Sequence, residues 1–172
     1  MISVTQQWVP LPTAPFLDTI SDPRILRRMP ETAEFIDAKR AITTRLAAHG
    51  ILPTPQRVEI ATLLLSTMQH LSAEQVREKI RSSGNAVSKA TVYNTLGLLV
   101  ERGLVRQVLV ESTQVFYDSN TVPHYHFYNV DDGTLQDVDP AELPVDHLPA
   151  PPTGTYTEGV DIVIRIRHCT DG

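Results

Sequence analysis

The sequence predicts an α+β chain, in which an N-terminal winged helix is followed by a small β-rich domain. Residues 72–84 and 88–103 have the spacing of a helix-turn-helix, two helices joined by a short turn. After them, β-rich runs at 104–110 and 114–118 flank a three-residue turn, as expected for the hairpin called a wing. The predicted parts are an extension at 1–30, the winged helix at 31–119 and a second domain at 120–172.

The stretch from Ser88 to Gly103 is the second helix of this motif. Ser88 is a favoured N-cap, and Gly103 is a favoured stop at which the chain turns into the left-handed region. One face is apolar at helical spacing, with Val92, Leu96, Leu99 and Val100. The opposite face bears Lys89, Tyr93, Asn94 and Gly97. Its cationic, aromatic and amide groups suit the phosphates and base edges of DNA, although the pattern alone also fits any amphipathic helix.

Three helices are predicted before it. The first covers 31–49 and has an apolar face of Phe35, Ala38, Ile42 and Leu46. The second begins with Thr54 as N-cap and Pro55 at its first position, and its predicted core face is Val58, Ala61, Leu65 and Met68. The third begins at Ser72, which forms a capping box with Gln75.

The part beyond Asp118 differs in pattern and in charge. Residues 1–118 contain 13 Lys/Arg and 11 Asp/Glu, a net charge of +2, whereas 119–172 contain 2 and 9, a net charge of −7, and together they give the −5 of the chain. This asymmetry confines any phosphate contact to the first part. Strands are predicted at 125–130, 134–138 and 160–167, with a short helix at 139–143. Three strands with so little helix leave a face uncovered in a monomer, so we predict a homodimer.

Several classes of protein are disfavoured by the composition. The single cysteine, Cys169, excludes a disulfide framework and a CxxC zinc cluster. No apolar run approaches the length of a membrane span, and Met1–Gln7 lacks the basic and apolar regions of a signal peptide. We therefore expect a cytoplasmic protein with no membrane partner. The proline-rich extension contains three arginines that fit solvated surface charge better than DNA contacts: Arg24, Arg27 and Arg28.

Histidines and carboxylates gather around the start of the second part. His124 and His126 lie two positions apart on an extended segment, so their side chains share a face. Asp118 ends the wing, Asp137 lies on the strand paired with the histidines, and His70 precedes the capping box. This mixed set of nitrogen and oxygen donors suits Fe²⁺, Mn²⁺ or Zn²⁺. Without thiolates it does not favour a closed structural zinc site, and on spacing alone a pair of surface histidines fits equally well.

Six short motifs occur in an order that resembles the ferric uptake regulator superfamily. They are Thr54–Arg57, His70–Glu74, Ala90–Tyr93, Glu101–Leu104, Phe116–Asp118 and His124–His126. The resemblance extends from about Gly50 to Asp137 and implies a homodimeric winged-helix repressor with a C-terminal dimerisation domain. In the related peroxide-sensing branch, the regulatory metal is bound by residues that match His70, Asp118, His124, His126 and Asp137.

The chain departs from the usual pattern of that superfamily at two metal sites. Asn129 and Asp132 stand where the first of two zinc-binding CxxC pairs is expected, so no structural zinc held by four cysteines is expected. Pro123 and Tyr125 replace the usual ligands of a second site.

The tail of the chain resembles a particular branch of the superfamily. The segment Asp137–Arg167, together with Asn94 in place of an arginine, resembles the iron response regulators of alphaproteobacteria. That branch senses iron through haem and controls haem synthesis and iron acquisition. Cys169 is followed by Thr170 rather than by the proline of the haem regulatory motif found in some members.

Together, these expectations predict that the protein is an iron- or haem-responsive transcriptional regulator and not an enzyme. Residues 31–119 would be its winged-helix DNA-binding domain and 120–172 its α/β dimerisation domain, with a divalent ion (Fe²⁺, Mn²⁺ or Zn²⁺), haem or both as effector. Ligation at the hinge would set the distance between two recognition helices on operator DNA. The predicted base contacts are Tyr93 and Asn94, the phosphate contacts are Arg57, Lys89 and Arg106, and Thr91 completes the DNA-binding set. Resemblance to the iron response branch favours DNA binding when iron is scarce.

Three alternatives remain open. A peroxide-sensing repressor would use the same ligands, because bound Fe²⁺ can oxidise its own histidines, although the missing structural cysteines disfavour it. A small non-haem iron enzyme would use the HxH pair with a carboxylate, but the helix-rich first part leaves too few strands to close a barrel. A metal-independent winged helix with a decayed site would bind metal equally with and without His124.

Overall fold

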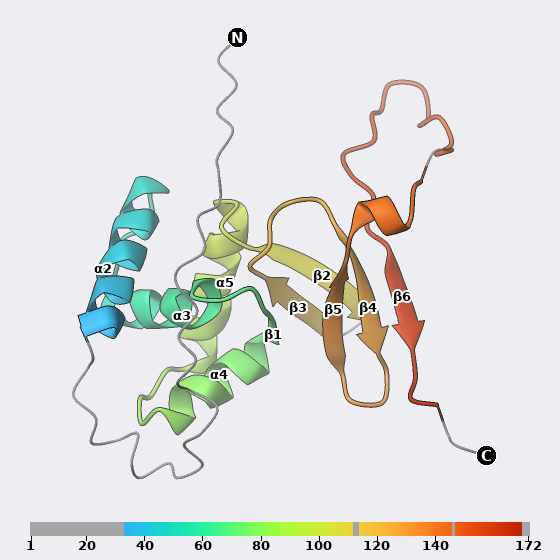
Figure 1. Ribbon diagram of the computed structural model, residues 1–172. Helices are drawn as coiled ribbons and strands as arrows, with labels where there is room; N and C mark the ends of the chain where they lie inside the picture. Colours follow the sequence, from blue (N-terminus) through green and yellow to red (C-terminus); the bar gives the residue numbers. More distant parts are fainter. Residues whose placement is uncertain (1–32, 112–113, 146, 170–172) are drawn as a thin grey trace.

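The computed structural model describes residues 33–111, 114–145 and 147–169. A helical domain and a β-rich domain lie on either side of a two-stranded hairpin, which is formed by β2 and β3 (Figure 1). The extension at 1–30, with its three arginines, lies outside the described residues. No helix of the described part is long and apolar enough to cross a bilayer.

Among the described residues, four α-helices build the first domain: α2 (Ala33–Ala48), α3 (Pro55–Leu65), α4 (Ala73–Ser82) and α5 (Lys89–Glu101). Each predicted N-cap is confirmed, because the side chains of Thr54, Ser72 and Ser88 accept a hydrogen bond from a backbone N–H in the first turn. Both hydrogen bonds of the capping box between Ser72 and Gln75 are present. Gly103 follows α5 with a φ of 67°, the left-handed conformation that ends the helix.

The helices pack around one apolar core. The side chains that are wholly buried in it include Leu46, Ile60, Leu64, Val76, Val92, Leu96 and Leu99. The predicted face of α3 was wrong in part, since Ile60 and Leu64 are buried together with Ala61, whereas Met68 lies beyond the helix and is 52% exposed. Helix α3 is apolar on several sides, so more than one stripe fits its sequence, and packing against α2, α4 and α5 selects among them.

The first sheet joins the wing to the helical domain. Its strands are β1 (His70–Ser72), β2 (Arg106–Glu111) and β3 (Gln114–Asp118), in the antiparallel order β1-β3-β2. Strand β1 was not predicted, because three residues are too few to show an alternating pattern. Its register places His70 directly opposite Asp118, so two predicted ligands become neighbours across the sheet.

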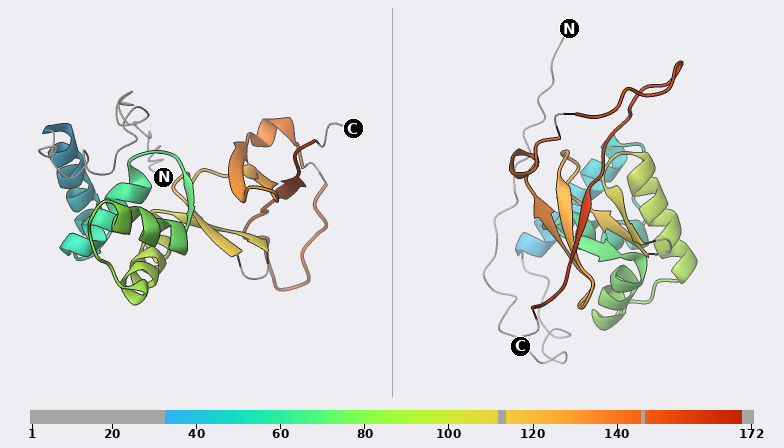
Figure 2. Two further views of the ribbon diagram at one scale, coloured as in Figure 1. Left: turned by 90° about the horizontal axis from the view of Figure 1, so that it is seen from below. Right: turned by 90° about the vertical axis from the view of Figure 1, so that its right-hand side faces the viewer.

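The second sheet contains β4 (Tyr125–Asn129), β5 (Thr134–Val138) and β6 (Val163–Ile166). Its order is β5-β4-β6, and β6 runs parallel to β4. A 3-10 helix η1 (Pro140–Glu142) follows β5, as expected, and β6 is shorter than the strand predicted at 160–167. The left view of Figure 2 shows this sheet on the far side of the wing from the helices.

Contacts between the wing and the second sheet form a joint between the domains. A small apolar cluster joins Val108, Val110 and Phe116 of the wing to Tyr128 of β4. The guanidinium of Arg106 on β2 lies 2.6 Å from the Asp161 carboxylate, and Arg165 on β6 donates a hydrogen bond of 2.7 Å to the carbonyl of Val110. The two domains therefore meet through both apolar and polar contacts.

Replacing Leu96 by alanine should lower the free energy of unfolding by about 2–5 kcal/mol, because the side chain is wholly buried and the truncation leaves a cavity. Leu109→Ala is the matched control, since Leu109 on β2 is 63% exposed and its loss should cost less than about 0.5 kcal/mol. Urea unfolding followed by circular dichroism measures both. Equal losses in the two variants would contradict this assignment of the core.

Candidate functional site

The structure brings the side chains of the five predicted ligands together at the joint. His70 on β1 and Asp118 at the end of β3 belong to the helical domain with its wing. His124 precedes β4, His126 lies on β4, and Asp137 lies on β5, where it pairs in register with His126. The group is therefore assembled from both domains.

The donor atoms of these side chains converge on a small volume. Nε2 of His124 lies 3.0 Å from Nε2 of His126 and 3.0 Å from Oδ2 of Asp118. Nε2 of His70 lies 2.8 Å from Oδ1 of Asp137 and 3.5 Å from Oδ1 of Asp118. One donor atom from each of His70, His124, His126 and Asp137 falls within 4.8 Å of the others. Donors at about 2.0–2.2 Å from a common metal lie at most about 4.4 Å apart, so the pairs at 2.8 Å and 3.0 Å suit a single ion.

Three of the converging atoms are buried without a hydrogen-bond partner. They are Nε2 of His70, Oδ2 of Asp118 and Oδ1 of Asp137, and the Asp118 side chain is wholly buried. Leaving one buried polar atom unpaired costs about 1–3 kcal/mol, more for a charged group, so three at one point indicate a binding site for a further group. A cation is the partner that fits two carboxylate oxygens and an imidazole lone pair, so the residues present fit a metal ion.

The protonation of two histidines also suits coordination. Burial lowers the pKa of His70 below its ordinary value, against the opposing charges of Asp118 and Asp137, which favours the neutral imidazole that binds metals. Nδ1 of His124 lies 2.6 Å from the carbonyl oxygen of Val122. Because a carbonyl only accepts, Nδ1 bears the proton and the lone pair of Nε2 faces the cluster.

Sequence reasoning missed Asn120, which contacts both carboxylates. Its backbone N–H donates to Oδ1 of Asp118 at 2.7 Å, and its side-chain amide donates to Oδ2 of Asp137 at 2.9 Å. A single asparagine in a short polar connector has no distinctive signal, because such residues are common in turns for local reasons.

The predicted DNA-binding residues of α5 form one exposed face. Lys89, Tyr93 and Asn94 are exposed on the side opposite the buried core residues of the helix. Nζ of Lys89 lies 5.5 Å from the centre of the Tyr93 ring and 3.1 Å from the carboxylate of Glu74 on α4. Hydrogen bonds from Lys89 and Arg77 lower the pKa of Glu74, so this pairing favours the charged carboxylate.

The other predicted DNA-binding residues have partners within the protein. The hydroxyl of Thr91 lies 2.9 Å from Oγ of Ser88 at the helix N-cap. Nη1 of Arg57 donates to the carbonyl of Leu52 at 3.1 Å. Arg106 contacts the carbonyl of Val122 as well as Asp161, which places it at the joint between the domains. A phosphate contact by Arg106 would therefore require its ion pair to open.

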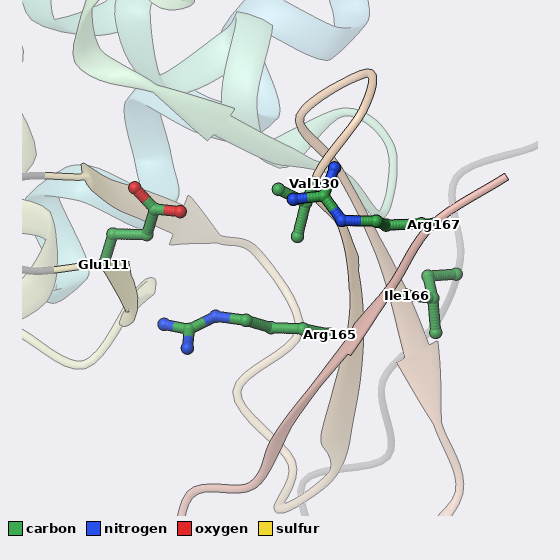
Figure 3. A pocket seen from close by; sticks show the side chains of 5 residues that line it. All are labelled: Glu111, Val130, Arg165, Ile166 and Arg167. Carbon is green, nitrogen blue, oxygen red and sulfur yellow. The ribbon is translucent and has the colours of Figure 1, made fainter.

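A groove of about 570 Å³ lies beside the joint, lined by Glu111, Val130, Arg165, Ile166 and Arg167 (Figure 3). Figure 3 shows the Arg165 side chain extending from β6 towards the strand that bears Glu111. Arg165 bonds to the wing backbone, and Arg167 lies 2.6 Å from Asp131. Both guanidinium groups are thus engaged in contacts within the chain.

Solved structures of ferric uptake regulators resemble this fold. The regulator from Pseudomonas aeruginosa, solved with manganese, has a TM-score of 0.57 and 24% identity, covering 74% of this chain and 98% of its own. The Vibrio cholerae regulator has a TM-score of 0.58 and 19% identity, covering 73% and 98%. These likenesses confirm the α+β class predicted from the sequence.

Curated relatives cover a shorter region. The peroxide operon regulator of Bacillus subtilis (strain 168) is 33% identical over 90 residues, which is 52% of this chain and 61% of the relative. The peroxide-responsive repressor PerR of Staphylococcus aureus (strain Mu50) is 32% identical over 81 residues, or 47% and 55%. The chain thus spans about three fifths or less of the length of these relatives.

The family model described as the ferric uptake regulator family matches residues 48–147. This match covers more than half of the chain and includes α3, α4, α5 and all five converging side chains. The chain therefore belongs to the ferric uptake regulator family.

Proposed function

We propose that this protein is a metal-responsive transcriptional regulator that binds operator DNA as a homodimer, with iron as its signal. The observation that supports it most is the cluster of buried, unpaired donor atoms at the joint between a helix with a DNA-compatible face and the second sheet. Membership of the ferric uptake regulator family agrees with this proposal.

The five side chains would hold the ion and couple its binding to the joint. A divalent ion, when bound, would supply positive charge between the wholly buried carboxylate of Asp118 and the buried Oδ1 of Asp137, whose side chain is partly exposed. His70 and Asp118 move with the helical domain and its wing, whereas His124, His126 and Asp137 move with the second sheet. Holding both sets at one centre restricts the angle between the domains. In a dimer, that angle sets the distance between two α5 helices, which must reach half-sites about 34–36 Å apart.

The geometry favours an ion over haem as the direct occupant. His124 and His126 are 6% and 2% exposed, and the Nε2 atom of each faces other ligands of the cluster rather than an open surface. The likeness of Asn94 and of the tail to iron response regulators makes haem the second effector to be tested.

Peroxide sensing is the second candidate function. Relatives with about one third identity are a peroxide operon regulator and a peroxide-responsive repressor. The cluster also places three imidazoles beside the proposed metal position, where oxidants formed at iron would react with them. The enzyme alternative finds no support, because the two sheets of the described residues are open and three-stranded rather than closed into a barrel.

Replacing His126 by alanine should weaken Mn²⁺ binding about 10-fold or more, because it removes a buried nitrogen donor from the cluster. Isothermal titration of metal-free protein measures the affinity. His168→Ala is the control, since this histidine is 66% exposed in the tail and should bind Mn²⁺ like the wild type. Equal affinity in His126→Ala and wild type would contradict the assigned site and support a decayed one.

Loading the site should change operator affinity by about 5–150-fold, the usual range of an allosteric coupling. The experiment selects a duplex from a random DNA pool with the full-length protein, and then measures binding to it by gel shift. The protein is tested metal-free, with Mn²⁺, with haem, and with Fe²⁺ followed by hydrogen peroxide.

Each result separates the candidates. Loss of binding with haem alone identifies haem as the effector, and a requirement for Mn²⁺ excludes that assignment. Loss of binding after peroxide identifies a peroxide sensor, if mass spectrometry also detects oxygen added to a histidine. Identical binding in all four states would contradict the proposed function.

Two substitutions on α5 should affect DNA binding differently. Asn94→Ala should cost about 1–3 kcal/mol on the selected operator and relax its specificity, because the exposed amide suits base edges. Lys89→Ala should weaken binding to all sequences and reduce the salt slope by about 1, because it removes a phosphate contact. Lys79→Ala on α4 removes the same charge outside this face and serves as the control. A loss of specificity in Lys89→Ala but not in Asn94→Ala would contradict these roles.

A further inference from the structure

Asn120 lies in the connector between β3 and β4, where the chain passes from the wing to the second sheet. It is half-buried, and it bonds to a carboxylate of each domain: through its backbone N–H to Asp118 and through its side-chain amide to Asp137. One residue outside the donor set thus links the two aspartates of the proposed site.

These hydrogen bonds divide the four carboxylate oxygens into two kinds. Oδ1 of Asp118 and Oδ2 of Asp137 accept hydrogen bonds from Asn120. Oδ2 of Asp118 and Oδ1 of Asp137 are buried, have no hydrogen-bond partner, and lie 3.0 Å from His124 and 2.8 Å from His70 respectively. In each carboxylate, the oxygen that lies nearest to an imidazole is the one that Asn120 leaves free, and the bonded Oδ1 of Asp118 lies farther away, 3.5 Å from Nε2 of His70.

The orientation of the Asn120 amide is itself fixed by the connector. Its Oδ1 accepts a hydrogen bond of 3.3 Å from the backbone N–H of Val122, so its nitrogen is directed at Asp137. The carbonyl of Val122 in turn accepts from Nδ1 of His124 and from Arg106. The connector therefore orients two carboxylates and one imidazole through a continuous set of hydrogen bonds.

We propose that Asn120 is a positioning residue that restricts both aspartates to binding through one oxygen each. The inference rests on the metal site proposed above. With one oxygen of each carboxylate occupied, the donor set contains three imidazole nitrogens and two carboxylate oxygens. A set limited in this way suits transition metals and disfavours Ca²⁺, which takes about 6–8 oxygen ligands and often binds carboxylates through both oxygens.

The proposal is tested by titrating metal-free Asn120→Ala with Co²⁺ and recording visible absorption. The substitution keeps the backbone bond to Asp118 and removes the bond to Asp137. We expect the Co²⁺ affinity to fall about 10–100-fold, as for other residues that orient metal ligands. We also expect the visible bands to change in intensity, because Asp137 can then bind through both oxygens and coordination number affects these bands.

Ser119→Ala is the matched control. Oγ of Ser119 accepts from the backbone N–H of Gln69 at 3.1 Å and donates to the carbonyl of Thr67, so the variant removes hydrogen bonds of the neighbouring residue in the connector and none to a carboxylate. It should show the wild-type spectrum. If Asn120→Ala folds poorly by circular dichroism, Asn120→Ser replaces it, since the serine hydroxyl ends one bond short of the amide nitrogen.

A wild-type Co²⁺ spectrum in the Asn120 variant overturns the proposal, whatever the affinity, because a merely structural role would weaken binding without altering coordination. The same spectral change in Ser119→Ala also overturns it. Failure of the metal site itself is distinct: the wild type would then bind no Co²⁺, or His126→Ala would bind it as tightly as the wild type. In that case the proposed function fails before Asn120 is tested.

Discussion

The burial of Asp118 is the constraint on which the arrangement of the two domains depends. This side chain is wholly buried at the end of β3, with one oxygen unpaired. Burying an isolated carboxylate costs far more than the stability of a small domain allows, so the charge must be met by hydrogen bonds and by a cation. Asn120, which follows the wing, supplies part of this compensation through its backbone N–H. The chain that leads into the second sheet is therefore held close to the Asp118 carboxylate.

The joint has a second set of contacts that contains no proposed metal ligand. Arg106 forms an ion pair with Asp161, and because this acid is exposed, the pair alone contributes little to stability. Arg165 bonds to the wing backbone beside a small apolar cluster. The donor cluster and these contacts restrain the same pair of bodies. The proposed effector would need to supply only the free-energy difference between two orientations of these connected domains, about 1–3 kcal/mol in allosteric proteins.

Local signals in the sequence were sufficient to predict most elements of the helical domain. The caps at Thr54, Ser72 and Ser88 depend on contacts within one turn, so the sequence alone locates them. The buried stripe of α5 was predicted for the same reason. The face of α3 was predicted only in part, because an apolar helix is oriented by its neighbours. Strand β1 exists only through pairing with β3, which no local pattern can show.

The candidate site was likewise predicted in part from the sequence. Its five donors were named from spacing and resemblance, and the structure brings them together. Two sets of contacts at the site were not predicted. The ion pair of Arg106 with Asp161 joins residues far apart in the sequence, and Asn120, which bonds to both aspartates, has no distinctive sequence pattern. The first of these contacts follows from the parallel placement of β6 beside β4, which requires the tail to return to the sheet.

That return also determines the order in which the molecule is completed during synthesis. Strand β6 leaves the ribosome after every element that it touches, so the free edge of β4 in the β4–β5 pair stays uncovered until then. Arg106 likewise waits for Asp161. The nascent protein can thus fold its helical domain early, whereas the contacts of Arg106 and Arg165 across the joint form only after β6 has been made.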